Sequence, residues 1–586
     1  MESKWIKRCL AKATTAGNIQ ATVDYRVVRT HPCIRARPEK SDSINGSSTS
    51  KPATVMAQFG TWQPKIRGKL FYNWPRSACE EELRFNDAGQ LGGEPYDVAI
   101  VGAGVVGCGL AYQLSQFDLR VLLVDRLHDV GEGTSKANSA IIHTGYDAEP
   151  GTLESELVRE ASALWPDLSD KLKIPFDPIG AMTMAVTDEQ ERQLEATEKK
   201  AHANRTDAVH ILSADEIHEH EPNASSKVRS GLLVPGEALG DPFTTSIAYA
   251  EVALANGVDI LLGCAIAGVE LGQGPGVSLH HLVTGEGHRL TVRRIVNAAG
   301  LGSRRLSDRY GGGEFDINPR RGQFVLFDKC ARSLVRHILL PVPTAHTKGV
   351  LVTPTIYGNL LAGPTAEDLP LGSPEATHTT VEGISKIMNG SSRLVDGLSR
   401  QPVIATYAGA RCACSQGSYW IRYNDGAPGI VTVTGVRSNG LTASISLARH
   451  LTVGMEKECG LDLSPDAAAL DTRPESAWPG WWRRPFENDA ANGSPDHRRP
   501  VCFCEVISEG EIRDALNSPL KPRSMDALKR RTRALMGRCQ GFDCQVPLAE
   551  IVSGHTGIAL EQLTKNGPGS ELVAPGQATR REEVLA

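Results

Sequence analysis

The sequence predicts a mixed α/β (α+β) protein, and two stretches of the chain carry that prediction. Between Tyr96 and Arg126, two short apolar runs flank a glycine-rich turn and a helical pattern. After Pro500, two amphipathic stretches of helical periodicity lie between two pairs of cysteines. The first stretch is typical of parallel strands layered with helices, and the second of a small, mainly helical domain.

Length and composition place the chain among ordinary multidomain proteins. Its 586 residues are enough for two or three domains, and 40% hydrophobic content supports a sizeable core. A net charge of −5 and 5% aromatic residues give no sign of nucleic-acid binding. No transmembrane segment is expected, because the uncharged run Val98 to Phe117 is glycine-rich and bounded by Asp97 and Asp118. Thirteen cysteines without a secretory signal do not suggest a disulfide scaffold.

Residues 1–95 form an N-terminal extension. Its first forty residues hold nine Lys and Arg against three acidic residues. Such a leader fits a mitochondrial targeting segment, a disordered tail or an over-long gene model, so a mitochondrial and a cytoplasmic location both stay open. Ser41 to Ser50 is a low-complexity linker, and aromatic residues between Phe59 and Phe85 suggest an irregular arm packed on the body.

The stretch 96–126 predicts a dinucleotide site. Val98 to Val101 is a β-branched run, and Gly102, Gly104 and Gly107 follow it in G-x-G-x-x-G order before a helical pattern. The glycines permit a tight turn, close approach of a pyrophosphate and close helix–strand packing, while the helix N-terminus attracts phosphate. Asp125 ends the next strand, where a carboxylate can accept hydrogen bonds from the ribose hydroxyls. An acidic residue there also argues against the 2′-phosphate of NADP. The alternative is a glycine-rich turn in another α/β protein.

A loop of small polar residues follows this unit. Ser135, Asn138 and Ser139 suit the surroundings of a flavin, since small groups leave its pyrophosphate and ring edge accessible. His143 is the first ionisable side chain after the loop, and it is read either as a catalytic group or as a core histidine.

With these motifs, the chain resembles the flavin oxidoreductases of the D-amino-acid oxidase superfamily. It is most similar to the branch of anaerobic-type glycerol-3-phosphate dehydrogenases and L-2-hydroxyglutarate dehydrogenases. Ile295 to Gly302, Asn318 to Leu326 and Gly429 to Leu447 resemble further family segments in the family's order. The resemblance implies an antiparallel sheet inserted into the flavin domain. Its candidate strands are Ala181 to Val186, Gly231 to Pro235, Gly322 to Phe327 and Gly349 to Pro354, with Gly358 to Thr365 as a further strand and Asp241-Pro242 opening the returning helix.

The motif and the resemblance together predict an FAD site. Its expected residues are Gly102, Gly104, Val105, Val106, Gly107, Asp125, Arg126, Ser135, Asn138, Ser139, Gly300, Gly435, Arg437, Gly440, Leu441 and Thr442.

The chemistry of a flavin dehydrogenase then assigns candidate catalytic residues. An arginine suits the anionic part of the substrate, because its planar fork matches carboxylate or phosphate. Candidates are Arg320, Arg321, Arg411 and Arg437, with Lys348 as the next choice. For the base that takes the hydroxyl proton, we expect His143 and then His346, because histidine titrates near neutral pH.

A second redox centre is indicated by Cys502-x-Cys504 and Cys539-x₄-Cys544. The segment resembles the bacterioferritin-associated-ferredoxin-like domain, which implies that these cysteines hold a [2Fe–2S] cluster. Zinc and plain thiols are the alternatives. Ser524 is the expected N-cap and Gly537 the expected stop of the helix between the pairs. The basic run Lys529, Arg530, Arg531 and Arg533 on that helix is read as a solvated face, as charge compensation for the cluster or as a docking site for an acidic partner. Cys412 and Cys414 are read as strand thiols.

These features give one functional prediction and several alternatives. We expect five regions: an N-terminal extension (1–95), an FAD-dependent oxidoreductase domain (96–455), a linker (456–499), a [2Fe–2S] domain (500–557) and a tail (558–586). The expected reaction is oxidation of a small anionic secondary alcohol, with glycerol 3-phosphate as first choice, and electrons leave through the cluster to an acceptor protein or a quinone, with partner subunits left open. Alternatives are a 2-hydroxy-acid dehydrogenase, an amine oxidoreductase, an oxidase with zinc in place of the cluster, and a non-catalytic electron-transfer or assembly subunit.

Overall fold

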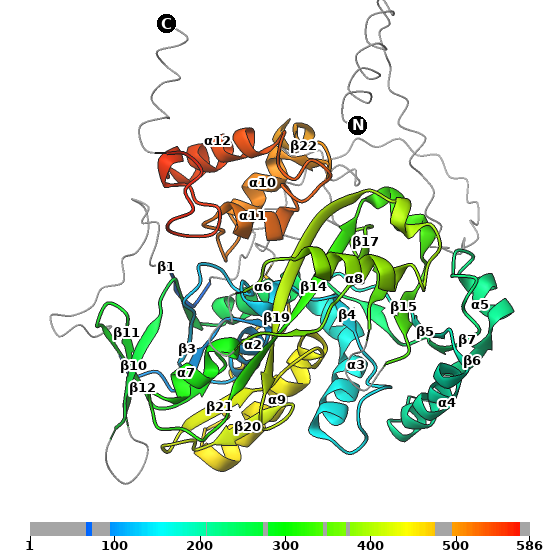
Figure 1. Cartoon of the computed structure of the whole chain (residues 1–586). Helices are drawn as coiled ribbons and strands as arrows, with labels where there is room; N and C mark the ends of the chain where they lie inside the picture. Colours follow the sequence, from blue (N-terminus) through cyan, green and yellow to red (C-terminus); the bar gives the residue numbers. More distant parts are fainter. Residues whose placement is uncertain are drawn as a thin grey trace, which may run out of the picture. The chain divides into compact units, whose positions relative to one another are not determined.

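The structure is a computed structural model that describes residues 66–72, 94–206, 208–272, 279–343, 349–370, 376–474 and 495–574. All of them belong to one unit of the chain, Trp62–Ala586. Two large sheets and a small helical domain account for most of this unit, so the predicted α/β (α+β) class is confirmed (Figure 1). The predicted targeting segment and linker 41–50 lie outside the described residues.

The first sheet has seven strands in the order β1-β9-β3-β2-β13-β21-β20. All neighbours pair in parallel except β20, which is antiparallel to β21. The strands are β1 (Leu70–Tyr72), β2 (Val98–Val101), β3 (Val121–Val124), β9 (Asp259–Leu262), β13 (Ile295–Asn297), β20 (Trp420–Tyr423) and β21 (Ile430–Thr434). The edge strand β1 lies within the predicted irregular arm 59–85, so that part of the arm is regular sheet.

Helices and a small sheet pack around this first sheet. The helices α2 (Val105–Leu114), α3 (Leu153–Leu172), α6 (Pro242–Ala255) and α9 (Gly440–Cys459) contact one another, with the short α7 (Ser303–Ser307) beside β13 and β21. Asp241 caps α6 through the Phe243 and Thr244 N–H groups, as the Asp-Pro motif predicts. The small sheet consists of β10 (Ile266–Glu270), β11 (His280–Thr284) and β12 (Arg289–Val292).

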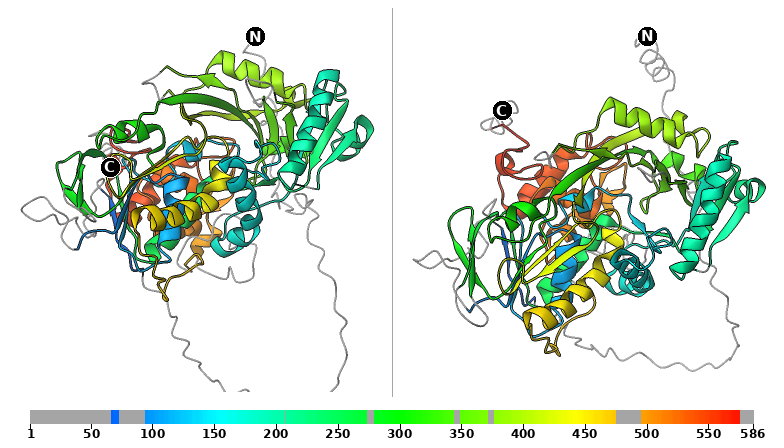
Figure 2. Two further views of the ribbon diagram at one scale, coloured as in Figure 1. Left: turned by 90° about the horizontal axis from the view of Figure 1, so that it is seen from below. Right: turned by 60° about the horizontal axis from the view of Figure 1, so that its bottom comes forward.

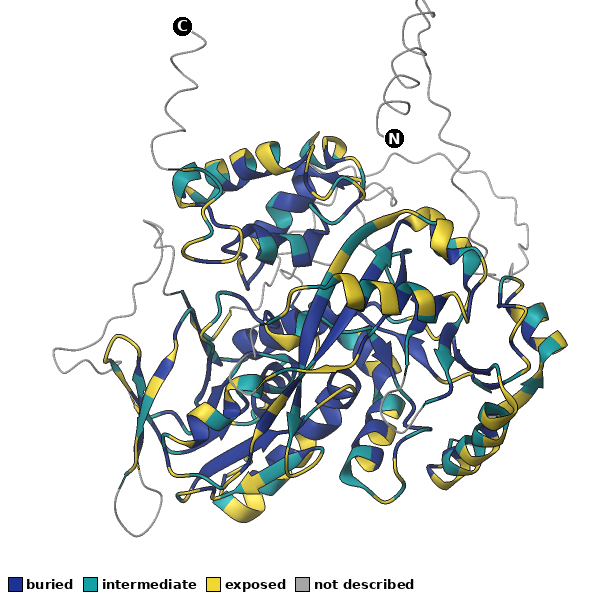
Figure 3. Ribbon diagram, viewed as in Figure 1, coloured by how far each residue is buried: buried dark blue, intermediate teal, exposed yellow. Residues whose placement is uncertain are grey.

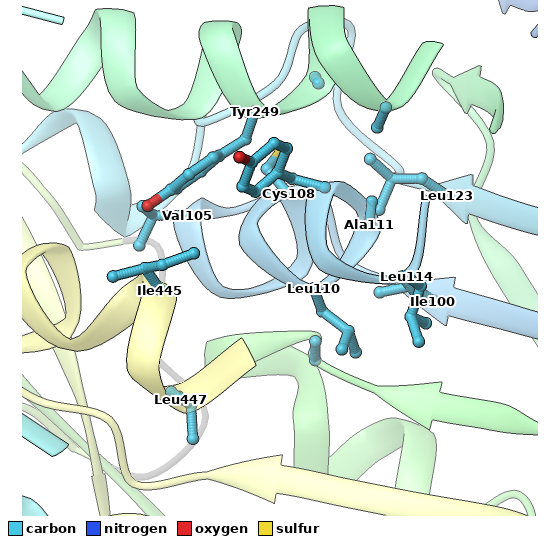
Figure 4. Close-up of a cluster of buried hydrophobic side chains, with 14 of the residues drawn as sticks. Ile100, Val105, Cys108, Leu110, Ala111, Leu114, Leu123, Tyr249, Ile445 and Leu447 are labelled. Carbon is cyan, nitrogen blue, oxygen red and sulfur yellow. The ribbon is translucent and has the colours of Figure 1, made fainter. Parts of the chain in front are cut away.

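Helix α2 lies at the centre of the largest apolar core. It is buried on most sides, because α6 and α9 flank it and β2 lies beneath it. Leu110 and Leu114 pack there with Ile100, Tyr249 and Leu447, all fully buried (Figure 4). Burial on most sides explains why α2 is almost entirely apolar, a pattern that resembles a membrane span in the sequence alone. None of the described helices is long and apolar enough to cross a membrane.

The second sheet has nine strands and is the predicted antiparallel insertion. Its path runs β18-β14-β17-β16-β15-β5-β7-β6, with β19 on the other edge of β14, and only β15 and β5 pair in parallel. The strands are β5 (Ala181–Ala185), β6 (His210–Ser213), β7 (Ser230–Val234), β14 (Ile317–Phe327), β15 (Ile338–Pro341), β16 (Leu351–Pro354), β17 (Leu360–Gly363), β18 (Glu367–Asp368) and β19 (Val403–Cys414). The candidate strands named from the sequence overlap β5, β7, β14, β16 and β17, and all but the one in β14 extend one or two residues beyond the observed strand.

Three helices cover parts of the second sheet. α8 (Val381–Ser391) packs on β14, β16 and β17, while α4 (Asp188–Ala203) and α5 (Ala214–His220) contact the β5–β7–β6 end. Figure 2 shows α4 and α5 at that end of the sheet in both views. A two-stranded ribbon of β4 (Ile141–Ile142) and β8 (Ala238–Leu239) leads back toward the first sheet.

The C-terminal domain is small and mainly helical, as expected. It holds α10 (Glu509–Leu516), α11 (Met525–Thr532) and α12 (Gln545–Thr556), plus the ribbon of β22 (Pro500–Cys502) and β23 (Ile507–Ser508). The described residues also form short 3-10 helices. Two of them, η8 (Pro495–Arg498) and η9 (Leu560–Gln562), lie in this C-terminal part, and the others are η2 (Thr134–Lys136), η3 (Gly300–Gly302), η4 (Lys329–Leu334) and η5 (Leu398–Arg400). Ile512, Leu528 and Leu548, one from each helix, belong to one buried apolar cluster, and Figure 3 shows buried and exposed residues alternating along α12.

One helix end differs from the prediction. Ser524 caps α11 through the Ala527 N–H group, as expected, but the helix ends at Thr532 and not at Gly537. Arg533 takes the left-handed conformation that terminates it, with φ of 68°. The Arg533 side chain donates to the buried Glu505 at 3.0 Å, and this contact favours an unusual conformation for a non-glycine residue.

Candidate functional site

A groove of about 220 Å³ runs over the carboxyl ends of β2, β3, β13 and β21. Most of the residues predicted to bind the cofactor line it. They are Gly102, Gly104, Val105, Val106, Asp125, Arg126, Ser135, Asn138, Gly300, Arg437, Gly440 and Leu441. Segments from four distant parts of the sequence therefore meet at one place, where parallel α/β sheets bind ligands.

Local backbone geometry explains the shape of the groove. Gly102 has φ of +116°, a conformation that favours glycine, and it places its carbonyl beside Gly107. The Asp125 carboxylate accepts the Ala103 N–H at 2.6 Å and the Leu127 N–H at 2.8 Å. Burial raises the pKa of Asp125, and these two backbone bonds oppose that shift. The Val105 N–H at the start of α2 donates to Ser135 Oγ at 2.9 Å, so Ser135 connects the polar loop to the glycine turn. This open glycine turn, with a carboxylate at its far end, fits a dinucleotide such as FAD.

Four of the predicted cofactor residues lie next to the groove and do not line it. Gly107 packs beneath the turn, and Gly435 supports the end of β21 with φ of +71°. Ser139 lines a neighbouring cavity. Thr442 is fully buried, and its hydroxyl accepts the His143 N–H at 3.0 Å, so it ties helix α9 to the segment directly after β4.

The predicted base His143 forms a pair with a buried carboxylate. Its Nδ1 lies 2.9 Å from Glu237 Oε2, and Glu237 is completely buried. The other oxygen of Glu237 accepts both the Thr144 N–H at 2.7 Å and the Thr144 hydroxyl at 2.9 Å. Nε2 of His143 has no hydrogen-bond partner among the described residues. The ring is therefore held from one side and has its second nitrogen available. His346 and Lys348 lie outside the described residues.

The candidate arginines have different surroundings. Arg321 is buried and makes a two-pronged contact with Glu367 at 2.8 and 2.9 Å, together with His378. Arg320 lies 3.4 Å from the exposed Asp368. Arg437 lines the groove and donates to Ser418. Arg321 is thus already neutralised by its own carboxylate partner.

Two candidate arginines, Arg411 and Arg437, have no carboxylate partner in the described part of the chain, and of these Arg411 is partly buried whereas Arg437 is exposed. The Arg411 side chain lies over Gly322 on β14, and its closest polar contact is a long one, 3.5 Å to the Thr365 carbonyl. Burial lowers the pKa of Arg411 to about 10, and the nearby charge of Arg320 adds to that shift. A partly buried guanidinium without a counter-ion is costly, and an anionic ligand would compensate it.

The four C-terminal cysteines approach one another in two pairs. A hydrogen bond from Cys544 lowers the pKa of Cys502 to about 6, and Cys504 and Cys539 are likewise within hydrogen-bonding reach. Among the described residues, no three His, Cys, Asp or Glu side chains converge as the ligands of a single ion would. Two pairs of thiolates fit a two-iron cluster, in which each iron takes two protein sulfurs. Phe503 and Phe542, each between two of these cysteines, are 70% and 90% exposed.

The basic run on α11 is not a solvated helix face, so that reading of the sequence is wrong. Arg530, Arg531 and Arg533 are buried. Arg530 and Arg531 donate to Asp129 of the flavin domain at 2.7 and 2.9 Å. Burial opposes ionisation of Asp129, but the two arginines outweigh it and lower the pKa of Asp129 to about 2. The run therefore joins the C-terminal domain to the loop that follows β3.

Sequence reasoning missed three residues of this region. Glu237 and Asp129 are single acids in loops, and no local motif marks their partners, which are 94 and about 400 positions away. Cys412 lines the groove, although the sequence indicates only a strand thiol. In the sequence, the one indication that Cys412 lies near the site was its position directly after the candidate residue Arg411.

Comparisons with known proteins agree with this geometry. Residues 97–453 match the family model "FAD dependent oxidoreductase", and residues 500–553 match the "BFD-like [2Fe-2S] binding domain". A glycerol 3-phosphate dehydrogenase of Caloramator mitchellensis is 33% identical over 82% of this chain and 98% of its own length. One subunit of the anaerobic glycerol-3-phosphate dehydrogenase of Escherichia coli is 24% identical over 83% and 95%. The structure of reduced L-α-glycerophosphate oxidase from Mycoplasma pneumoniae, with FAD bound, is 30% identical with a TM-score of 0.60, over 64% of this chain and 98% of that one.

The glycine turn gives a direct test of the groove. In Gly107→Ala the new Cβ would lie 1.8 Å from the Gly102 carbonyl oxygen, so the turn must move. We expect purified Gly107→Ala to lose its FAD and about 3 kcal/mol of unfolding free energy. Gly133→Ala is the matched control, because it lines the same groove with nothing within 4 Å of the new Cβ. Equal FAD content in both variants, measured by absorbance, would contradict the role of the turn.

Proposed function

We propose that this chain, which belongs to the FAD-dependent oxidoreductases and carries a BFD-like [2Fe–2S] domain, oxidises glycerol 3-phosphate to dihydroxyacetone phosphate. The relatives of highest identity reported above act on glycerol 3-phosphate by name, and they are matched over almost their whole length. The observation that carries the proposal is Arg411, a partly buried cation without a carboxylate partner among the described residues. It suits the phosphate of a small substrate.

The residues divide the chemistry between them. When bound, FAD accepts the hydride from the substrate carbon, and the cluster carries the electrons onward. Arg411 binds the phosphate and so orients the secondary alcohol. His143 takes the hydroxyl proton at Nε2, while Glu237 holds its Nδ1–H. The N-terminus of α9, a helix of 20 residues, presents its positive dipole end to the groove and favours negative charge there.

We further propose that the electrons leave to an acceptor protein, such as a partner subunit. The exposed rings of Phe503 and Phe542 support this, because they form apolar surface directly beside the cluster cysteines. A quinone is the alternative acceptor.

An anaerobic titration of the FAD- and cluster-loaded protein tests the proposed function. Glycerol 3-phosphate should bleach the flavin absorbance and reduce the cluster, and glycerol should do neither, because it lacks the anion. Bleaching by L-2-hydroxyglutarate alone would identify this 2-hydroxy acid as the substrate in place of glycerol 3-phosphate. Bleaching by amino acids alone would show that the protein oxidises amines and not alcohols. No bleaching by any of these would favour a non-catalytic electron-transfer subunit. Rapid reoxidation of the cluster by a free quinone would contradict the protein acceptor.

The variant Arg411→Met tests the anion site. Removing a charge-assisted contact should raise the KM for glycerol 3-phosphate by about 10- to 100-fold, with a smaller change in kcat. Arg411→Lys should recover part of the loss, because it keeps the charge and loses the planar fork. The control is Arg320→Met, at a partly exposed arginine that already faces Asp368. An unchanged KM in Arg411→Met would contradict this assignment.

The variant Glu237→Gln tests the pair with His143. Both Thr144 donors hold one oxygen of the side chain, so the amide NH₂ of glutamine would face Nδ1. The neutral ring must then carry its proton on Nε2, which removes the base. We expect kcat to fall by about 100-fold with little change in KM. Glu221→Gln is the matched control, because Glu221 is an equally buried partner of His337 away from the groove. Equal losses of kcat in the two variants would show that only structure was disturbed.

A further inference from the structure

A second cavity, of about 320 Å³, lies between three parts of the chain. One wall is the polar loop 136–140, which also borders the cofactor groove through Asn138. A second wall comes from the substrate sheet and the start of α6, and the third from α11 with Met536 and Gln540 of the cluster domain. Arg411 is not among the described residues that line it. The proposed function leaves this cavity unused.

The cavity carries an excess of positive charge. Lys136, Lys529, Arg530 and Arg533 line it, against the single carboxylate of Asp526. Arg530 and Arg533 have buried partners in Asp129 and Glu505. The two lysines are less closely paired. Lys136 Nζ makes a long ion pair of 4.0 Å with the buried Glu132, and no ion pair or hydrogen bond joins Lys529 Nζ to another described residue.

Both lysines are held in partly buried positions where their charge is unfavourable. Burial lowers the pKa of Lys529, the nearby carboxylate of Asp526 opposes that shift, and Arg530 and Arg533 add to it. Burial and Arg530 likewise lower the pKa of Lys136, against the opposing charge of Glu132. Two partly compensated ammonium groups that line one cavity favour an anion beside them.

The lining of the cavity is also apolar and aromatic. Phe243 and Tyr357 stack with ring centroids 6.3 Å apart, and Arg533 covers the Tyr357 ring at 3.7 Å. Tyr407 is fixed by a hydrogen bond from its hydroxyl to the Asn138 carbonyl at 2.9 Å. A ligand would thus meet both ammonium groups and rigid rings, a combination typical of small-molecule sites.

We propose that this cavity is a second binding site, for a small organic phosphate or carboxylate with an apolar or ring-bearing body. Its anionic group binds to Lys136 and Lys529, and its body packs against Phe243, Tyr357 and Tyr407. Because Lys136 belongs to the flavin domain and Lys529 to the cluster domain, a bound ligand contacts both domains at once. The site does not depend on glycerol 3-phosphate being the substrate.

The test uses Arg411→Met protein loaded with FAD and the cluster, so that the proposed substrate anion site is already removed. Isothermal titration with inorganic phosphate and with phenyl phosphate measures the second site. We expect both to bind, and phenyl phosphate to bind more tightly, because its ring meets the aromatic side. Adding Lys529→Met should weaken phenyl phosphate binding by about tenfold, and Lys529→Arg should retain it.

Lys521→Met is the matched control, because Lys521 is an exposed lysine of the same domain. It should leave the Kd unchanged. Absence of binding to the loaded Arg411→Met protein would overturn the proposal, as would an unchanged Kd in Lys529→Met or equal losses in Lys529→Met and Lys521→Met. None of these outcomes bears on flavin bleaching by glycerol 3-phosphate, so the two proposals fail separately. Tighter binding of inorganic phosphate than of phenyl phosphate would show that the cavity binds a simple anion. It would overturn the proposal that the ligand has an apolar or ring-bearing body.

Discussion

The arrangement of the two cofactor-binding parts depends on one buried carboxylate. Asp129 is 2% exposed, and both its oxygens are taken by Arg530 and Arg531 of α11. Two residues further along, the Gly131 N–H donates to the Ala103 carbonyl within the glycine turn. The same short loop therefore contacts the cluster domain with a side chain and the cofactor groove with its backbone. Loss of one partner from such a buried ion cluster leaves an uncompensated charge and costs roughly 3 to 5 kcal/mol.

A second buried acid extends this contact to the cluster itself. Glu505 follows Cys504 directly and is held by Arg533 at 3.0 Å and by Lys329 of the second sheet region at 2.9 Å. The cysteine loop is thus joined to the oxidoreductase domain by the pair of Glu505 with Lys329. Buried pairs of this kind give orientation more than stability, because desolvation offsets much of their attraction. A fixed orientation suits a domain whose cofactor must stay near a neighbouring groove.

Local motifs made the cofactor-binding parts predictable from the sequence. The glycine turn, Asp125, the capped helices α6 and α11, and the cysteine pairs each have their signal within a few residues. The residues that complete the site do not. Glu237 pairs with His143 across 94 positions, and Asp129 meets α11 across about 400. The basic run on α11 looked solvated because a sequence window reveals charge but not the acid that comes from elsewhere. For the same reason, four arginines were equal candidates until the structure assigned carboxylate partners to two of them.

Hydrogen exchange tests the Asp129 contact most directly. In Asp129→Asn, the amides of α11 should exchange faster than in the wild-type protein, while those of α2 in the central core keep their protection. That result would show that one carboxylate holds the cluster domain against the flavin domain. Unchanged exchange throughout α11 in the variant would contradict the account, since the domains would then be joined by other contacts.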